Sequence, residues 1–194
     1  MTHQSGELFM RLFTMAALAA ATLPLAACLG GGGDSDGDLP ENFEEIADLY
    51  EAAEAGELEE ATEEMMSGTA TLEGAIAFED VGEDEDLEVI GDLTLSANFT
   101  TNEVTGSADS FEIYTDDDEV EATLSGSLEV DGDITGTTMT ADLWGTLTDD
   151  EDHDISMIMD GTFYDADGDL AVAGDVEGTI DDEYHEGGFA AIEE

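Results

Sequence analysis

Basic residues are almost absent from this sequence. It contains one Lys or Arg, which is Arg11, against 53 Asp and Glu residues. Without cationic side chains the chain cannot neutralise phosphates or anionic head groups, so nucleic acids and anionic lipid surfaces are excluded as electrostatic partners. After Arg11 only His153 and His185 can carry a positive charge. Solution cations or a partner must therefore balance the carboxylates.

Cysteine and long hydrophobic runs are also scarce. The single Cys28 cannot form an intramolecular disulfide. The apolar stretch 12–27 ends close to the glycine run 30–33, and it is too short for a transmembrane helix, which needs about 20 apolar residues. A positive charge at Arg11, an apolar centre and small residues before Cys28 are instead typical of an export signal.

The segment Leu25-Ala26-Ala27-Cys28 resembles the lipobox of bacterial lipoproteins. This resemblance implies a signal peptide over 1–27, cleavage before Cys28 and attachment of diacylglycerol to its thiol. The alternative is a spare thiol near an ordinary cleavage site, where it lacks a pairing partner. The next residue is Leu29, whereas Asp at this position commonly marks inner-membrane retention in such lipoproteins. We therefore expect the outer membrane, with the cell surface and the periplasmic face both open.

Two segments separate the cysteine from the main domain. Residues 28–39 are rich in Gly, Asp and Ser, a composition typical of a flexible linker. Residues 40–67 are predicted as an amphipathic helix, because Phe43, Ile46 and Tyr50 recur at helical spacing and the repeat resumes after Gly56. We expect this helix to pack on the main domain, and partner binding is the alternative.

From residue 69 the hydrophobic period changes from about 3.6 to about 2 residues. Met139, Ala141 and Leu143 alternate with polar residues, and the same pattern recurs in segments joined by short acidic or Gly-containing turns. Short connections predict antiparallel neighbours. A change of phase between Ala108 and Phe111 predicts a β-bulge. The sequence thus indicates eight strands.

Glycines in the apolar phase of these strands, among them Gly74, Gly91 and Gly161, favour closure, because a small barrel needs sharply bent and closely packed strands. The predicted fold is all-β, an eight-stranded antiparallel up-and-down β-barrel over 69–194 preceded by the short helical segment. A membrane-spanning barrel would enclose the carboxylates in a narrow lumen at a high desolvation cost. The predicted barrel is therefore soluble and tethered, with its acids outward.

Three stretches resemble the β-barrel domain of the transferrin-binding protein B family of surface lipoproteins. They are Leu95–Gly106, Gly161-Thr162-Phe163-Tyr164 followed by 172–174, and the closing 187–191. The resemblance covers about residues 87–194. It implies a barrel displayed at the outer membrane, capture of host iron carriers or haem-containing ligands, and in some members a dedicated outer-membrane translocator.

The chain departs from that family in two ways. Asp165-Ala166 stand where Gly-Pro commonly follows the Phe-Tyr pair, and no handle subdomain or second lobe fits into the short segment before the barrel. Transferrin itself is therefore not the expected ligand, and no family binding residue carries over.

Trp144 and Tyr164 are the candidate partner-binding residues, because both are large aromatic residues in the outward phase of their strands. We expect them to share one patch. For Trp144 the alternative is that the helix over 40–67 covers it.

Metal and cofactor motifs are not found. The segments 34–38 and 165–169 begin like EF-hand loops, but Leu39 and Leu170 occupy the sixth position, where that loop needs Gly. No cofactor is expected, and Ca²⁺ has no supporting motif. The acidic clusters 116–119 and 149–152 leave Ca²⁺ or a basic partner as the alternative to a solvated acidic surface.

Catalysis is not expected. Lipidation consumes the Cys28 thiol, and both histidines after Arg11 lie in acidic, turn-like segments, so no nucleophile with a base and an orienting partner is found. His153 between two aspartates is a poor zinc set. We expect a ligand-capture module that binds a protein or haem. The alternative is a structural acidic surface lipoprotein of a salt-adapted bacterium.

Overall fold

The computed structural model describes residues 43–79, 81, 87–115 and 120–193. Cys28, the predicted signal peptide and linker, and the acidic cluster 116–119 lie outside this part of the chain. The described elements, in chain order, are α2 (Phe43–Glu54), β1 (Glu59–Glu60), β2 (Thr69–Phe78), β3 (Leu87–Asn98), β4 (Glu103–Thr115), β5 (Val120–Thr123), β6 (Ser125–Thr135), β7 (Thr138–Thr148), β8 (Asp152–Ala166), β9 (Asp169–Ile180) and β10 (Glu183–Glu193).

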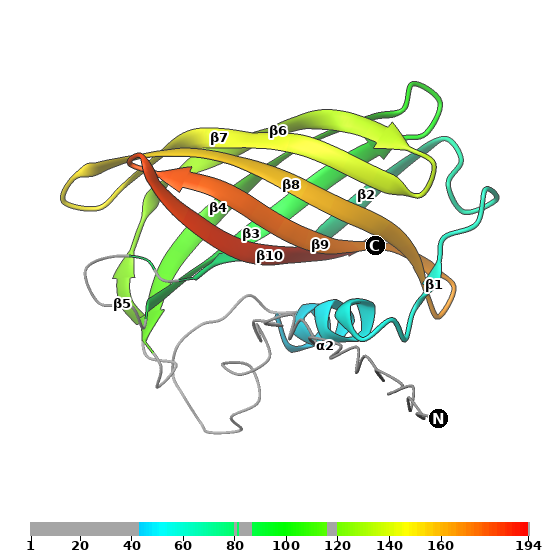
Figure 1. Cartoon of the computed structure of the whole chain (residues 1–194), viewed down its shortest axis with the longest axis horizontal. Helices are drawn as coiled ribbons and strands as arrows, with labels where there is room; N and C mark the ends of the chain where they lie inside the picture. The colour runs from blue at the N-terminus through cyan, green and yellow to red at the C-terminus, as the bar shows by residue number, and fades with distance from the viewer. Residues whose placement is uncertain (1–42, 80, 82–86, 116–119, 194) are drawn as a thin grey trace, which may run out of the picture.

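Eight antiparallel strands close into a barrel (Figure 1). Chain neighbours pair from β2 round to β10, and β10 pairs with β2 to complete the ring. The short β5 pairs with β4 beside β6, so these two strands share one place in the wall. Between them the Leu124 N–H donates to the Phe111 carbonyl at 2.8 Å. The predicted all-β fold is confirmed.

The apolar side of each strand faces the inside of the barrel. On β7 the buried Met139, Ala141 and Leu143 alternate with exposed Thr140 and Asp142. Four phenylalanines, at positions 78, 111, 163 and 189, are fully buried inside the barrel, and none of the described polar or charged residues is buried. The period of 2 in the sequence thus separates an apolar interior from an acidic exterior.

The predicted bulge is confirmed in β4. The register between β3 and β4 shifts between Ile90 and Asp92, so that Ser110 and Phe111 together oppose Gly91. Ser110 has a φ of 58°. A Cβ on Gly91 would lie 2.4 Å from the Phe111 ring, so only glycine lets this ring turn into the core here.

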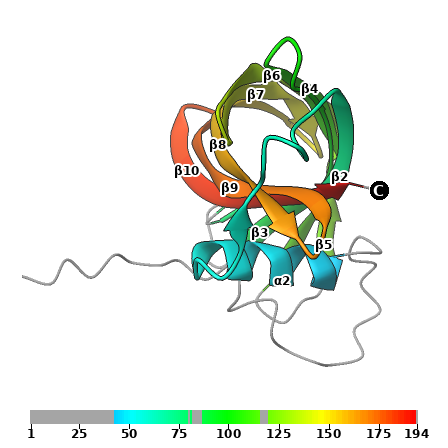
Figure 2. The ribbon, with the colours of Figure 1, turned by 90° about the vertical axis from the view of Figure 1, so that its right-hand side faces the viewer.

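Helix α2 packs on the outside of the barrel against β2, β9 and β10 (Figure 2). Its apolar residues, including Phe43, Ile46 and Tyr50, meet small side chains such as Ala173 on the sheet. Gly188 permits the close approach, since a Cβ there would lie 2.7 Å from the Tyr50 ring. The prediction that the helix packs on the main domain is confirmed.

The helix predicted over 40–67 is wrong beyond its first half. The described helix ends at Glu54, and Gly56 takes a φ of 67°, the left-handed conformation that commonly ends helices. The chain then forms β1, which pairs with the C-terminal end of β8. The next residue, Ala61, donates its N–H to the Phe163 carbonyl at 2.9 Å. Pairing with the barrel outweighs the helical spacing of Leu58 and Ala61.

The two ends of the barrel therefore differ. Residues 57–67 cross one opening (Figure 2), where Met65 and Met66 pack on the core; we call this the closed end. The opposite end carries the β7–β8 and β9–β10 turns and also the β2–β3 and β4–β5 connections, parts of which lie outside the described residues. We call it the open end, for the cavity that the described residues form there. Among the described residues, one hydrophobic cluster fills the barrel and a second joins the helix to its outer wall. None of the described helical segments is long and apolar enough to cross a membrane.

Candidate functional site

The open end of the barrel holds a cavity of about 450 Å³. Its floor consists of buried side chains, namely Phe78, Val89, Leu124, Leu147 and Ile155, and half-buried Val81, Leu87, Ile113 and Ile180 line the wall above them. The volume lies in the range of about 300 to 1,000 Å³ that is typical of small-molecule sites. An eight-stranded barrel is just wide enough to enclose one small ligand where side chains do not fill it.

Five polar residues border the mouth of this cavity: Asp149, His153, Asp181, Glu183 and His185. Most of them continue the inward phase of their strands, because Asp149 follows Leu147 by two positions and His153 precedes Ile155 by two. Glu183 and His185 stand in the same phase as the buried Phe189. The pleat of the strands therefore turns these groups toward the cavity.

His153 joins the β7–β8 and β9–β10 turns at the open end. Its Nδ1 lies 2.7 Å from Asp181 Oδ2 in the β9–β10 turn, and its Nε2 lies 3.3 Å from Asp149 Oδ1 in the β7–β8 turn. The hydrogen bond to Asp181, helped by Asp149, raises the pKa of His153 against the opposing effect of burial. Both ring nitrogens of the imidazolium are donors. Within the described ranges these are the only ion pairs.

The two carboxylates beside His153 are fixed by backbone groups. Asp181 Oδ1 accepts the Asp154 N–H at 2.8 Å, and Asp149 Oδ1 accepts the Glu151 N–H at 2.9 Å. These backbone donors first, and His153 second, lower the pKa of both carboxyls. Asp181 and the next residue have φ of 52° and 70°, as a two-residue type I′ hairpin turn requires. These contacts therefore fix the positions of the Asp149, His153 and Asp181 side chains at the mouth of the cavity.

The remaining two mouth residues are less engaged. His185 Nδ1 lies 3.4 Å from the Glu79 carbonyl oxygen. The Glu183 carboxylate accepts no hydrogen bond from any other described residue. Glu183 and one ring nitrogen of His185 thus stay available to a ligand in the cavity.

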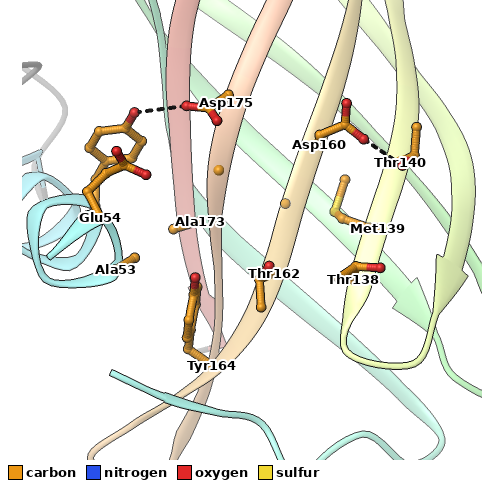
Figure 3. Close-up of a pocket in the computed structure, with 13 residues that line it drawn as sticks. Ala53, Glu54, Thr138, Met139, Thr140, Asp160, Thr162, Tyr164, Ala173 and Asp175 are labelled. Carbon is orange, nitrogen blue, oxygen red and sulfur yellow. Dashed lines mark hydrogen bonds between the residues drawn. The ribbon is translucent and has the colours of Figure 1, made fainter. Parts of the chain in front are cut away.

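A second hollow, of about 350 Å³, lies on the outer wall between α2 and strands β7 to β9 (Figure 3). Tyr50 donates to Asp175 at 3.4 Å, and Thr140 donates to Asp160 at 2.6 Å. Burial first, and the Asp175 charge second, raise the pKa of Tyr50, which keeps its phenol protonated. Because its polar groups already bond one another and its lining has little apolar surface, this groove is the weaker candidate for a small ligand.

The two predicted partner-binding residues lie apart. Tyr164 lines the outer groove (Figure 3) and is half-buried against the apolar cluster under α2. Trp144 pairs with Ser156, eight residues from Tyr164 on β8, which is about 27 Å along the strand. Trp144 is 40% exposed, and α2 packs on β2, β9 and β10. The expectations of a shared patch and of a helix covering Trp144 are both wrong.

Trp144 instead shares the outer wall with other exposed apolar residues. Cross-strand pairing places Trp144, Ser156, Thr179 and Tyr184 in one row from β7 to β10, and Ile158 lies in the next row. Ile158 is 44% and Tyr184 60% exposed. The Tyr184 hydroxyl lies 2.9 Å from Glu177 and 3.0 Å from Glu186, and these carboxylates raise its pKa. This part of the outer wall is therefore the candidate contact surface for a larger partner.

The acidic segments 149–152 and 165–169, which are candidates for Ca²⁺ binding within the described residues, lie at turns. Gly168, with a φ of 106°, donates its N–H to Asp165 Oδ1 at 2.8 Å in the β8–β9 turn, which confirms the turn predicted over 165–169. Residues 149–152 make the β7–β8 connection. In the part of the chain that the structure describes, no group of three His, Cys, Asp or Glu side chains is placed to hold a metal ion. The segment 34–38 lies outside that part.

Sequence reasoning places His153 and His185 in acidic turns and misses the cavity that they border. Two signals point to it. Both histidines keep the inward phase of neighbouring apolar residues, and in a meander alternate turns lie at the same end of the sheet. The hydrophobic periodicity does not indicate which end of the barrel is crossed by the segment that precedes it.

The chain matches no family model and no curated protein.

Proposed function

We propose that this protein is a lipid-anchored lipoprotein whose barrel captures a ligand at its open end. The observation that carries the proposal is the apolar cavity at that end, bordered by Asp149, His153, Asp181, Glu183 and His185. An apolar floor with a few polar groups at the mouth is the usual composition of a small-molecule site. The role is non-catalytic, and the barrel positions and encloses the ligand.

The anchor and the location rest on the lipobox-like sequence ending in Cys28. Diacylglycerol on Cys28 would tether the barrel to the outer membrane, facing the cell surface or, as the alternative, the periplasm. The resemblance to the transferrin-binding protein B family supports a role in iron or haem acquisition, with export through an outer-membrane translocator. A protein ligand would then contact the exposed surface around Trp144, and a small ligand the cavity.

Labelling with radioactive palmitate tests the anchor. The full-length protein should take up label and fractionate with outer membranes, whereas Cys28→Ser should do neither. Protease added to intact cells distinguishes the two faces, because only a surface-displayed barrel is cut. Label in the Cys28→Ser variant would disprove lipidation at this cysteine.

Capture is tested with residues 34–194, which contain the whole helix and barrel unit. Organic extraction and mass spectrometry of the purified protein should find a stoichiometric small molecule, and haem is detected by its absorbance. Ile180→Phe adds volume inside the cavity, and Ile158→Phe makes the same change on the outer wall. Loss of the ligand in Ile180→Phe alone supports the cavity. Equal ligand content in both variants argues against it.

A second candidate function is a structural acidic coat of a salt-adapted bacterium. It is favoured by one observation: the described exterior carries carboxylates but, since Arg11 lies outside the described residues, no Lys or Arg. Such a protein has no specific ligand, and salt stabilises it by screening self-repulsion. Melting in NaCl and CaCl₂ at equal ionic strength should then give equal temperatures, and a lower requirement for Ca²⁺ would indicate specific sites.

A further inference from the structure

Acidic residues outnumber basic residues at the mouth of the open-end cavity. Three carboxylates, on Asp149, Asp181 and Glu183, face it together with the imidazole rings of His153 and His185. The described exterior adds only further carboxylates and no Lys or Arg. Because fields of one sign are focused at a cleft with low-dielectric walls, a ligand that approaches this cavity meets a negative potential.

The imidazole ring of His153 is already engaged. Both ring nitrogens of His153 face carboxylates, at 2.7 Å from Asp181 and 3.3 Å from Asp149. An anionic head group would find His153 engaged and at most one ring nitrogen of His185 available as a donor, and it would lie beside three carboxylates. An ammonium group, in contrast, can donate to Glu183, which has no described hydrogen-bond partner, and to the remaining lone pairs of the two aspartates.

The apolar wall residues of the cavity determine the chemistry of the part of the ligand that lies inside the barrel. Val81, Leu87, Ile113 and Ile180 are half-buried around the cavity, so an alkyl or aromatic body entering it would cover apolar surface that now contacts water. The floor below is closed by Phe78 and Leu147, which are buried. The ligand therefore enters tail first and keeps its head at the mouth.

We infer that the open end takes small cationic amphiphiles, with an apolar body in the barrel and an amine or quaternary ammonium head among Asp149, Asp181 and Glu183. The inference rests on the proposed capture function and names the ligand class for that site. It also predicts that haem, whose propionates are anionic, is a poor occupant of this cavity. A haem-bearing or iron-carrying protein would have to bind on the outer wall.

Three probes with the same ten-carbon chain test this: decylammonium, decanol and decanoate, each below the concentration at which it forms micelles. Titration calorimetry on residues 34–194 near neutral pH should show saturable binding of decylammonium, about tenfold tighter than that of decanoate. Raising the salt from about 0.15 M to about 1 M should shrink this preference, because the Debye length falls from about 8 to about 3 Å.

Two variants with the same change of charge locate the effect. Glu183→Gln at the mouth should weaken decylammonium severalfold and leave decanol unchanged, whereas Glu129→Gln, exposed on the outer wall, should alter neither. Decanoate that binds as tightly as decylammonium would overturn the cationic preference while leaving capture intact. If none of the three probes binds, the capture function itself fails.

Discussion

The closed end of the barrel is covered by main chain, whereas the open end is bordered by charged side chains. At the closed end Ala61 bonds the Phe163 carbonyl, and Phe163 packs edge-on against Phe99 with ring centroids 5.3 Å apart. At the open end the wall residues stay half-buried and His153 holds two turns together. Residues 57–67, which lie between α2 and β2, cover the closed end. One end contributes stability and the other leaves room for a ligand.

Truncating an aromatic residue at the closed end should have the largest effect. Phe163→Ala removes a side chain that is 1% exposed and leaves a cavity under the covering segment, so we expect a loss of about 3 to 5 kcal/mol in the free energy of unfolding. Urea denaturation of residues 34–194 measures it. Ile113→Ala at the open end should cost only about 1 kcal/mol, because its side chain is half-buried and borders an existing cavity. Similar losses in both variants would contradict the distinction between the ends.

Detaching the helix should loosen the closed end selectively. In Gly188→Val the new side chain collides with the Tyr50 ring, because even a single Cβ added at this position would lie 2.7 Å from that ring. Such overpacking typically costs about 1 to 3 kcal/mol. Helix α2 leads directly into the segment over the closed end. Hydrogen exchange should therefore accelerate at the amides of Ala61 and Met66, which are hydrogen-bonded there.

The control for Gly188→Val is the amide of Asp154 at the open end, which donates to Asp181 and should keep its exchange rate. Equal acceleration at both ends would mean that the helix stabilises the whole barrel and not its closed end. The same valine in a Tyr50→Ala background should cost less, because the ring that it meets is gone.

The strands could be predicted from the sequence because one side of each strand faces solvent and the other faces the apolar interior. The alternation of Met139, Ala141 and Leu143 with polar residues directly indicates which side faces inward, and the change of phase before Phe111 indicates the bulge. The helix could not be bounded in the same way. Leu58 and Ala61 keep helical spacing, but their positions are set by pairing with β8, a contact about a hundred residues away in the sequence.

The candidate site was harder to predict because it depends on which residues the strand registers bring together. His153 and Asp181 are 28 residues apart, and they meet only because the β8 and β9 registers bring two turns to the same end. Trp144 and Tyr164 share an outward phase, yet the phase of a strand gives no distance along it. Local pattern identifies the face of a residue, and strand register identifies its neighbours.

The pair of carboxylates around His153 should give the open end a small stability that depends on pH. The pKa of His153 is raised above its ordinary value of 6.5, so the stabilisation is fully present below about 6.5 and is lost as the pH rises through the raised pKa. The pKa values of Asp149 and Asp181 are lowered from 3.8, so on the acid side the stabilisation is lost as the pH falls through those lowered values.

The melting temperature of wild type minus that of His153→Gln should therefore be largest between about pH 4 and about pH 6.5 and vanish in alkaline solution. Solvent screening keeps the effect small. His185→Gln removes a histidine that bonds no carboxylate and serves as the control. A difference that grows with pH would show that His153 is not held as a cation, and the open end would then lack the contact that ties its two turns together.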